Sequence, residues 1–141
     1  MASYTKFNQF VEDLAKKVHN LNSDTLKVML TNTAPSAANT VLANITEITP
    51  GNGYSAGGSA ATFVSGVQSS GTYKLVLNDV TFTASGGSIG PFRYAVLYND
   101  TPTSPADPLI AWWDYGTPLT LTNGNSFTVN LDQSSGVFTL V

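Results

Sequence analysis

The sequence lacks cysteine and has a single histidine, His19. The absence of cysteine excludes a disulfide framework and any zinc site built on thiolates. A Ser-His-Asp arrangement would have to be built around His19. The pattern Gly-x-Ser-x-Gly occurs at residues 53–57 and 86–90, but neither stretch joins a predicted strand to a predicted helix, which is the context that a nucleophilic serine requires. His19 is expected at the end of a helix, in a solvated or capping role. We therefore predict a protein that is not an enzyme and has no catalytic residue, cofactor or metal ion.

Charge is scarce as well. Charged residues make up 11% of the 141 residues, whereas typical domains carry about 25%. The six basic residues are dispersed except for the pair Lys16-Lys17, so no cluster is present that would neutralise phosphates, and nucleic acid is not an expected partner. The low charge has two compatible interpretations. It reflects the Thr, Ser, Asn and Gly content of strands and turns, or it avoids repulsion between many copies placed side by side.

Long apolar runs are also missing. No segment approaches the roughly 20 apolar residues of a membrane span, and the residues after Met1 lack the apolar stretch of a signal peptide. We therefore expect a soluble protein made in the cytoplasm, with no membrane partner. The length is that of one ordinary domain.

One amphipathic helix is predicted near the start of the chain. The apolar residues Phe7, Phe10, Val11, Leu14 and Val18 follow one face of a helix over residues 4–19. We assign residues 1–22 to this helix, packed on or beside the rest of the molecule. Because the face is rich in aromatic rings, Phe7 and Phe10 are candidates for contact with a protein partner.

Residues 23–141 are predicted to form a single β-sandwich domain. Eight or nine short strand-like runs recur, which is typical of an antiparallel sandwich or barrel. We expect a mainly β, antiparallel, jelly-roll-like sandwich, with an immunoglobulin-like sandwich as the alternative. Asn123-Gly124-Asn125 gives the strongest hairpin prediction because Asn-Gly adopts the positive φ angles of tight turns. The runs are 26–31, 61–64, 73–77, 80–83, 92–98, 109–115, 119–122, 127–131 and 137–140, and 92–98 is predicted to be central and buried on both faces.

Two further segments are candidates for a protein interface. The glycine-rich stretch 51–58 is predicted to be a flexible or extended surface loop, in which Gly51, Asn52, Gly53 and Tyr54 let a partner approach closely. Trp112 and Trp113 are adjacent, so in a strand they point to opposite faces. One of them faces outward unless a helix, loop or subunit covers it, and exposed aromatic rings favour protein or carbohydrate contacts.

Three aspartates, Asp100, Asp107 and Asp114, recur at intervals of seven residues. Carboxylates of this kind ligate Ca²⁺ or act as glycosidase acids. Asp100 and Asp107 stand beside prolines in a loop, and the sequence lacks the dense Asp-x-Asp-x-Asp-Gly pattern of a calcium loop. Turn formation is therefore the preferred interpretation.

Several segments of the chain resemble a known group of proteins in amino-acid sequence. They lie at 17–21, 26–35, 39–48, 51–58 and 90–100, the last reading Gly-Pro-Phe-Arg-Tyr-Ala-Val-Leu-Tyr-Asn-Asp. Together these segments, which are spread over residues 17–100, resemble small structural proteins of tailed-bacteriophage particles, some of which decorate or cement the capsid.

The resemblance implies a role and a set of partners. It implies a capsid decoration (cement) protein that binds the assembled head shell and stabilises it, located on the capsid surface of the virion and synthesised in the host cytoplasm. The implied partners are the major capsid protein and further copies of the chain itself, as a homotrimer or another homo-oligomer. The alternative is a phage tail or receptor- or glycan-binding structural module.

Overall fold

The structure is a computed structural model that describes residues 3–141. Strands account for 46% of the chain and helix for 7%. The elements in chain order are β1 (Thr5–Lys6), α1 (Gln9–Ala15), β2 (Leu26–Thr31), the 3₁₀ turn η1 (Leu42–Asn44), β3 (Ser59–Ala60), β4 (Phe63–Ser69), β5 (Thr72–Leu77), β6 (Val80–Thr83), β7 (Ile89–Asn99), β8 (Leu109–Leu121), β9 (Ser126–Val129) and β10 (Phe138–Leu140).

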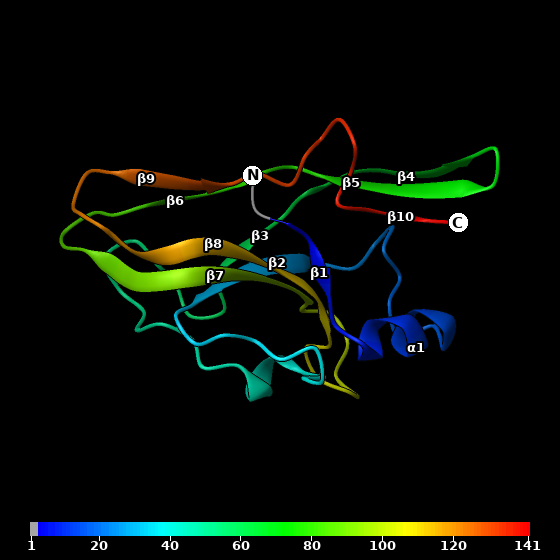
Figure 1. The fold of residues 1–141 in the computed structure, drawn as a ribbon, viewed down its shortest axis with the longest axis horizontal. Helices are drawn as coiled ribbons and strands as arrows, with labels where there is room; N and C mark the ends of the chain where they lie inside the picture. Colours follow the sequence, from blue (N-terminus) through cyan, green and yellow to red (C-terminus); the bar gives the residue numbers. More distant parts are fainter. Residues whose placement is uncertain (1–2) are drawn as a thin grey trace.

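The strands form two layers of antiparallel sheet (Figure 1). The larger sheet has the order β1-β8-β7-β2-β3, with β7 at its centre. The other layer consists of the sheet β10-β5-β4 and the ribbon β6-β9, which follow one another because β6 begins soon after β5 ends. The mainly β class, the antiparallel pairing and the single α-helix of the sequence prediction are confirmed. The arrangement agrees with a β-sandwich, and the jelly-roll connectivity stays a prediction.

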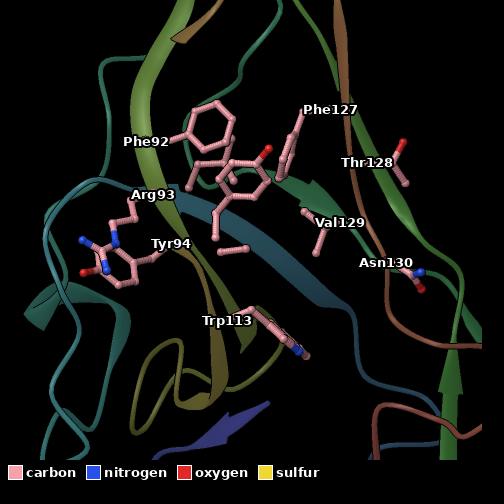
Figure 2. Close-up of a pocket in the computed structure, with 11 residues that line it drawn as sticks. Phe92, Arg93, Tyr94, Trp113, Phe127, Thr128, Val129 and Asn130 are labelled. Carbon is pink, nitrogen blue, oxygen red and sulfur yellow. The ribbon is translucent and has the colours of Figure 1, made fainter. Parts of the chain in front are cut away.

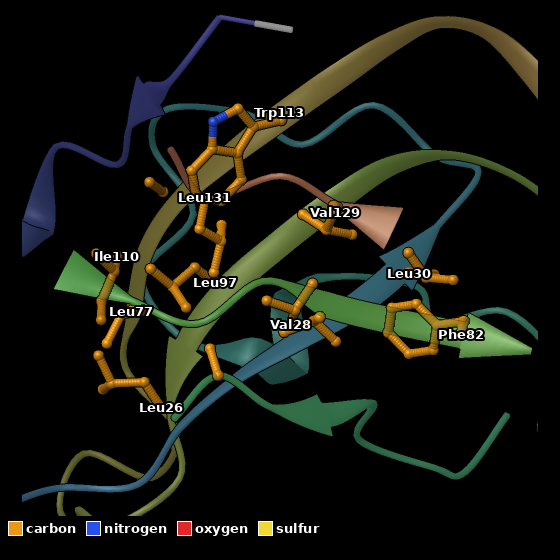
Figure 3. Packing of buried hydrophobic residues seen from close by; sticks show 14 of the residues in the cluster. Leu26, Val28, Leu30, Leu77, Phe82, Leu97, Ile110, Trp113, Val129 and Leu131 are labelled. Carbon is orange, nitrogen blue, oxygen red and sulfur yellow. The ribbon is translucent and has the colours of Figure 1, made fainter. Parts of the chain in front are cut away.

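The main core lies between the two layers (Figure 3). Alternate residues of β2 point into it, since Leu26, Val28 and Leu30 are each at most 2% exposed. Leu77 and Phe82 cover them from the opposite layer. Burial of apolar surface at roughly 25 cal/mol per Å² makes this interior the main source of stability.

The other face of the larger sheet is covered as well. Met29, Val96 and Tyr98 point to this face, where Leu42 and Ile45 of the segment between β2 and β3 pack against them. The Tyr98 hydroxyl donates a hydrogen bond to the Gly57 carbonyl at 2.6 Å, which ties the covering segment to the sheet. Residues 95–99 of β7 are therefore all buried, which confirms the prediction of a central strand covered on both faces.

The helix is shorter than predicted. It spans Gln9–Ala15, not residues 4–19. Thr5 and Lys6 are instead extended, because they pair with Trp112 and Ala111 of β8. The helix ends where Lys17 adopts a positive φ of 66°. Within the described residues, no helix has the length and apolar character needed to cross a membrane.

The predicted hairpin at Asn123-Gly124 is wrong. The turn exists, with Gly124 at φ 89° and the Asn125 N–H bonded to the Thr122 carbonyl at 3.0 Å. The strand that follows it, β9, pairs with β6 and not with β8. The turn is held by Ala84 at the end of β6, whose carbonyl accepts from Gly124 N–H at 2.8 Å. The chain therefore crosses from one layer to the other at this point.

Candidate functional site

A cleft lined by aromatic rings opens between the two layers, which we call the aromatic cleft (Figure 2). Its volume is about 240 Å³. One wall is formed by β7 and β8, the other by β9 and the residue that follows it, and Leu30 of β2 contributes from between them. The lining residues are Leu30, Phe92, Arg93, Tyr94, Ala95, Trp113, Tyr115, Phe127, Thr128, Val129 and Asn130.

An irregularity in the sheet shapes the wall on β7. Phe92 and Ala95 belong to the same core and line the same cleft although they lie three positions apart, whereas strict alternation along a strand would place them on opposite faces. The β7–β8 register shifts between Ile89 and Phe92 and again between Phe92 and Tyr94. These bulges reset the alternation, so that Phe92 and Ala95 both line the aromatic cleft.

Three rings form the upper part of the cleft. Phe127 meets Phe92 edge to face, with ring centroids 5.1 Å apart, and meets Tyr115 in the same manner at 5.5 Å. Tyr115 keeps 52% of its surface exposed, whereas Phe92 is buried. Edge-to-face pairs of this kind add about 0.5–1.5 kcal/mol to the burial of the rings. The cleft therefore has a preformed aromatic wall with one ring open to solvent.

Arg93 forms an ion pair with Asp114 on the side of β7 and β8 that faces away from Phe127 and Val129 (Figure 2). Arg93 Nε and Nη2 donate to the two Asp114 carboxylate oxygens at 2.7 and 2.9 Å, and the guanidinium lies 5.3 Å from the centre of the Tyr94 ring. The Asp114 carboxylate also accepts from the Gly116 N–H at 2.8 Å. The Arg93 hydrogen bond, followed by that of Gly116, lowers the pKa of Asp114, and the same ion pair raises the pKa of Arg93.

A second hollow of about 160 Å³ adjoins Trp113. Trp113 and Asn130 line both hollows, and the Tyr4 ring packs edge-on against Trp113 at 5.9 Å. The indole thus separates two depressions on the same side of the molecule. Together they offer apolar burial and ring contacts, with the Tyr115 ring half-exposed at the border of the aromatic cleft. Such contacts can bind a partner molecule.

The predicted candidates in the N-terminal segment lie in the interior. Phe7 precedes the helix and is fully buried, and Phe10 on α1 is 3% exposed. Phe10 packs against His19 and Phe138. Neither side chain is presented at the surface, because both rings fill the space between the N-terminal segment and the sheets. Val11, a member of the predicted apolar face, is 53% exposed, so that face is not buried as a whole.

The two tryptophans point to opposite faces of β8, as predicted. Trp113 enters the main core at 9% exposure, while Trp112 lies on the other face, half-buried, with its ring 4.6 Å from Phe7. The cover for Trp112 comes from Phe7 and the segment around η1, not from the helix. Of the two, only Trp113 borders the aromatic cleft.

The glycine-rich stretch is anchored and not a flexible loop. Gly51, Asn52 and Gly53 are exposed, but Tyr54 is 2% exposed and bonded to Glu47 and Leu30. The Asn52 amide donates to the Ser88 carbonyl at 2.9 Å. The structure therefore divides the predicted contact loop into a surface part and a core residue.

His19 is buried, which corrects the prediction of a solvated residue. It is 5% exposed, and its Nδ1 lies 3.1 Å from the Asn99 amide nitrogen. Burial lowers the pKa of His19, and the charges of Asp13 and Asp24 oppose this shift. The cause is Asn99 at the end of β7, which draws the residues after the helix onto the sheet.

Asp100 and Asp107 lie close to each other, whereas Asp114 does not join them. Asp100 is paired with Lys27 at 3.0 Å, and Asp107 adopts φ 50°, which confirms its role in a turn. Burial, followed by the charge of Asp100, raises the pKa of Asp107. Asp114 is bound to Arg93. Within residues 3–141, no three acidic or histidine side chains gather into a group that would hold a metal ion.

Three residues of the cleft were not predicted as site residues. From the sequence, Phe92, Tyr115 and Phe127 are assigned only to predicted strands. Phe127 follows the Asn-Gly turn, and its position in the cleft depends on the change of layer described above. The bulge in β7 that turns Phe92 inward cannot be predicted from a single sequence, because no local sequence pattern indicates it.

Searches against protein-family models, curated proteins and solved structures found no match to this chain.

Proposed function

We propose that this protein is a structural component of a tailed-bacteriophage particle, which decorates the assembled capsid and stabilises it by binding and not by catalysis. The observation that carries the proposal is the aromatic cleft. The resemblance of the sequence to structural proteins of tailed-bacteriophage particles suggests the capsid surface as the location. The proposed partner is the major capsid protein.

The cleft suits a protruding side chain of a protein partner. A cavity of about 150 Å³ holds a benzene-sized ring, so 240 Å³ accommodates one large apolar side chain. Tyr115 exposes half of its surface while Phe127 and Val129 stand opposite. Aromatic residues in pockets of this type dominate the energy of protein interfaces.

The scarcity of charge supports dense packing on a shell. With a net charge of −3 and 11% charged residues, neighbouring copies repel one another little. Molecules that bind only the assembled shell stabilise it by mass action, because disassembly must first break their contacts. Many weak sites arranged on one particle add further avidity.

The first test measures the copy number in purified virions by quantitative mass spectrometry against the major capsid protein. Hundreds of copies are expected of a decoration protein. A handful to a few dozen would place the protein in the tail or neck, and none would overturn the virion assignment.

The second test addresses the cleft. Tyr115→Ala removes an exposed ring, so the fold should persist, and co-sedimentation with capsids that lack the protein should weaken at least tenfold. Val11→Ala is the matched control, because Val11 is equally exposed but lies on α1. Equal binding of both variants and the unaltered protein would exclude the cleft as the capsid contact.

A tail module that binds host-surface glycan is the second candidate. It is favoured by the exposed Tyr115 ring, because sugars stack on aromatic faces. Binding of the purified protein to host-surface glycan, lost in Tyr115→Ala, would favour it over capsid decoration.

A further inference from the structure

Strand β4 (Phe63–Ser69) forms one edge of the smaller sheet. In the order β10-β5-β4 it pairs with β5 on one side, and no strand among residues 3–141 pairs with its other side. The β4–β5 hairpin extends beyond the larger sheet on the side where α1 lies (Figure 1). Val64 and Val67 expose 50% and 63% of their surface. The free edge is therefore accessible and partly apolar.

The edge lacks the features that prevent strands from pairing. Natural edge strands are protected by charged side chains, proline or bulges. The run Ser65–Ser69, Ser-Gly-Val-Gln-Ser, contains neither charge nor proline, and the bulge in β4 precedes it, at Val64. By contrast β8, which pairs with β1 only at Ala111 and Trp112, carries Pro118 further along that side. The open edge of β4 thus carries none of these protective features over residues 65–69.

The hairpin geometry shows which backbone groups face outward. The turn residues Ser70 and Gly71 have φ angles of 51° and 83°, as in the two-residue turns that join antiparallel strands. The flanking pair Ser69 and Thr72 is then hydrogen-bonded across the hairpin, and residues alternate from there. The N–H and C=O groups of Gly66 and Gln68 consequently point to the free edge.

We propose that β4 pairs with β4 of a second copy of this chain, antiparallel about a two-fold axis through Val67. The run is symmetric about that residue, since serines stand two positions before and two after it. Val67 faces the partner's Val67, and Ser65 faces the partner's Ser69. Gly66 and the partner's Gln68 exchange backbone hydrogen bonds, as do Gln68 and the partner's Gly66. The two sheets become one sheet of six strands.

Charge does not oppose this pairing. The nearest charged side chain is Lys74, opposite Val67 on β5, and its ammonium donates to the Ser134 carbonyl at 3.1 Å. In the joined sheet the two lysine strands are separated by three strand spacings, about 14 Å. This exceeds the Debye length of about 8 Å at physiological ionic strength. A second copy therefore fits the edge in hydrogen bonding, side-chain pattern and charge.

The pairing is isologous, so the same patch serves both partners and the assembly closes at two copies. This inference concerns the isolated protein and does not rest on capsid binding. A protein that dimerises but does not decorate capsids would leave it intact.

The experiment measures molecular mass in solution by sedimentation velocity and light scattering, from micromolar to near-millimolar concentration. The unaltered protein is expected to form dimers as the concentration rises. Val67→Lys and Val67→Glu place like charges opposite each other at the axis, so each should weaken self-association at least tenfold. Val11→Lys is the matched control, because it alters an exposed valine on α1 and should dimerise as the unaltered protein does.

Mixing the two charged variants tests directly whether the two-fold axis passes through Val67. Equimolar V67K and V67E should form a heterodimer, because opposite charges then face each other only if the two-fold axis passes through Val67. In the unaltered protein, amide exchange at Gly66 and Gln68 should slow with concentration. A monomer throughout the range, an undiminished V67K dimer, or a mixture without heterodimer would overturn the proposal.

Discussion

Tyr54 and Glu47 form a buried hydrogen bond, in which the phenol oxygen donates to the Glu47 carboxylate at 2.8 Å. The same phenol oxygen accepts from the Leu30 N–H at 3.1 Å, and the same carboxylate accepts from the Gly57 N–H at 2.6 Å. Burial raises the pKa of Tyr54 far above its ordinary range, so the phenol keeps its proton and remains the donor. The pair connects β2, the covering segment and the glycine-rich stretch.

Removing that hydroxyl should therefore destabilise the fold. Tyr54→Phe leaves the Leu30 N–H without its partner and removes one of the two donors to the Glu47 carboxylate, which keeps the Gly57 N–H. An unsatisfied buried group costs about 1–3 kcal/mol. Urea denaturation should show a loss of this size. Tyr115→Phe is the control, since Tyr115 is half-exposed, and an equal loss in both variants would contradict this account.

Gly58 should tolerate no side chain. A Cβ there would overlap the Val28 carbonyl, and φ is +79°. Gly124→Ala, at φ +89° with nothing nearby, incurs only the backbone cost of about 1–2 kcal/mol. We expect Gly58→Ala to exceed this control clearly in thermal and chemical denaturation. Comparable losses would mean that the contact with β2 is not tight.

Stability should fall as the pH is lowered from neutral. Burial lowers the pKa of His19 below 6.5, so the unfolded chain takes up a proton at a higher pH than the folded one. The free energy of unfolding therefore decreases as the pH falls through about 6.5, and levels off below the folded pKa. Denaturation of the unaltered protein and His19→Gln between pH 7.5 and 5 isolates this effect, because the chain has one histidine. Parallel curves would refute it.

The Arg93–Asp114 pair should contribute little to stability. Its side chains are 35% and 41% exposed, and exposed ion pairs are worth about 0–1 kcal/mol. A double-mutant cycle with Arg93→Ala and Asp114→Ala should give a coupling energy in that range, smaller at high salt. A coupling of several kcal/mol would show that this ion pair makes a large contribution to the stability of the fold.

The sequence predicted best where a local pattern decides the outcome. Strand β2 (Leu26–Thr31) and strand β6 (Val80–Thr83) have the predicted bounds, since their alternation or apolar run is self-contained. The helix was predicted too long because pairing of Thr5 and Lys6 with β8, more than a hundred residues away, overrides the helical spacing.

The candidate site was predicted less well for the same reason. Trp113 was correctly identified as one of two opposed tryptophans, yet the cleft beside it is made by a bulge in β7 and by the crossing of β9 to the other layer. Both depend on contacts between segments remote in sequence. The scarcity of charge on the surface could be predicted from the composition alone.

The aromatic contacts at the base of the projecting hairpin have a consequence for biosynthesis. Phe138 on β10 stacks on Tyr4 at 6.4 Å and meets Phe10 at 5.4 Å, so nearly the whole described sequence separates the rings that pack together. While the chain emerges from the ribosome, Tyr4 and Phe10 lack their contacts with Phe138 until translation has passed that residue. Native closure of this corner thus requires that β10 has been synthesised, and premature termination before β10 would leave these rings exposed to chaperones and proteases.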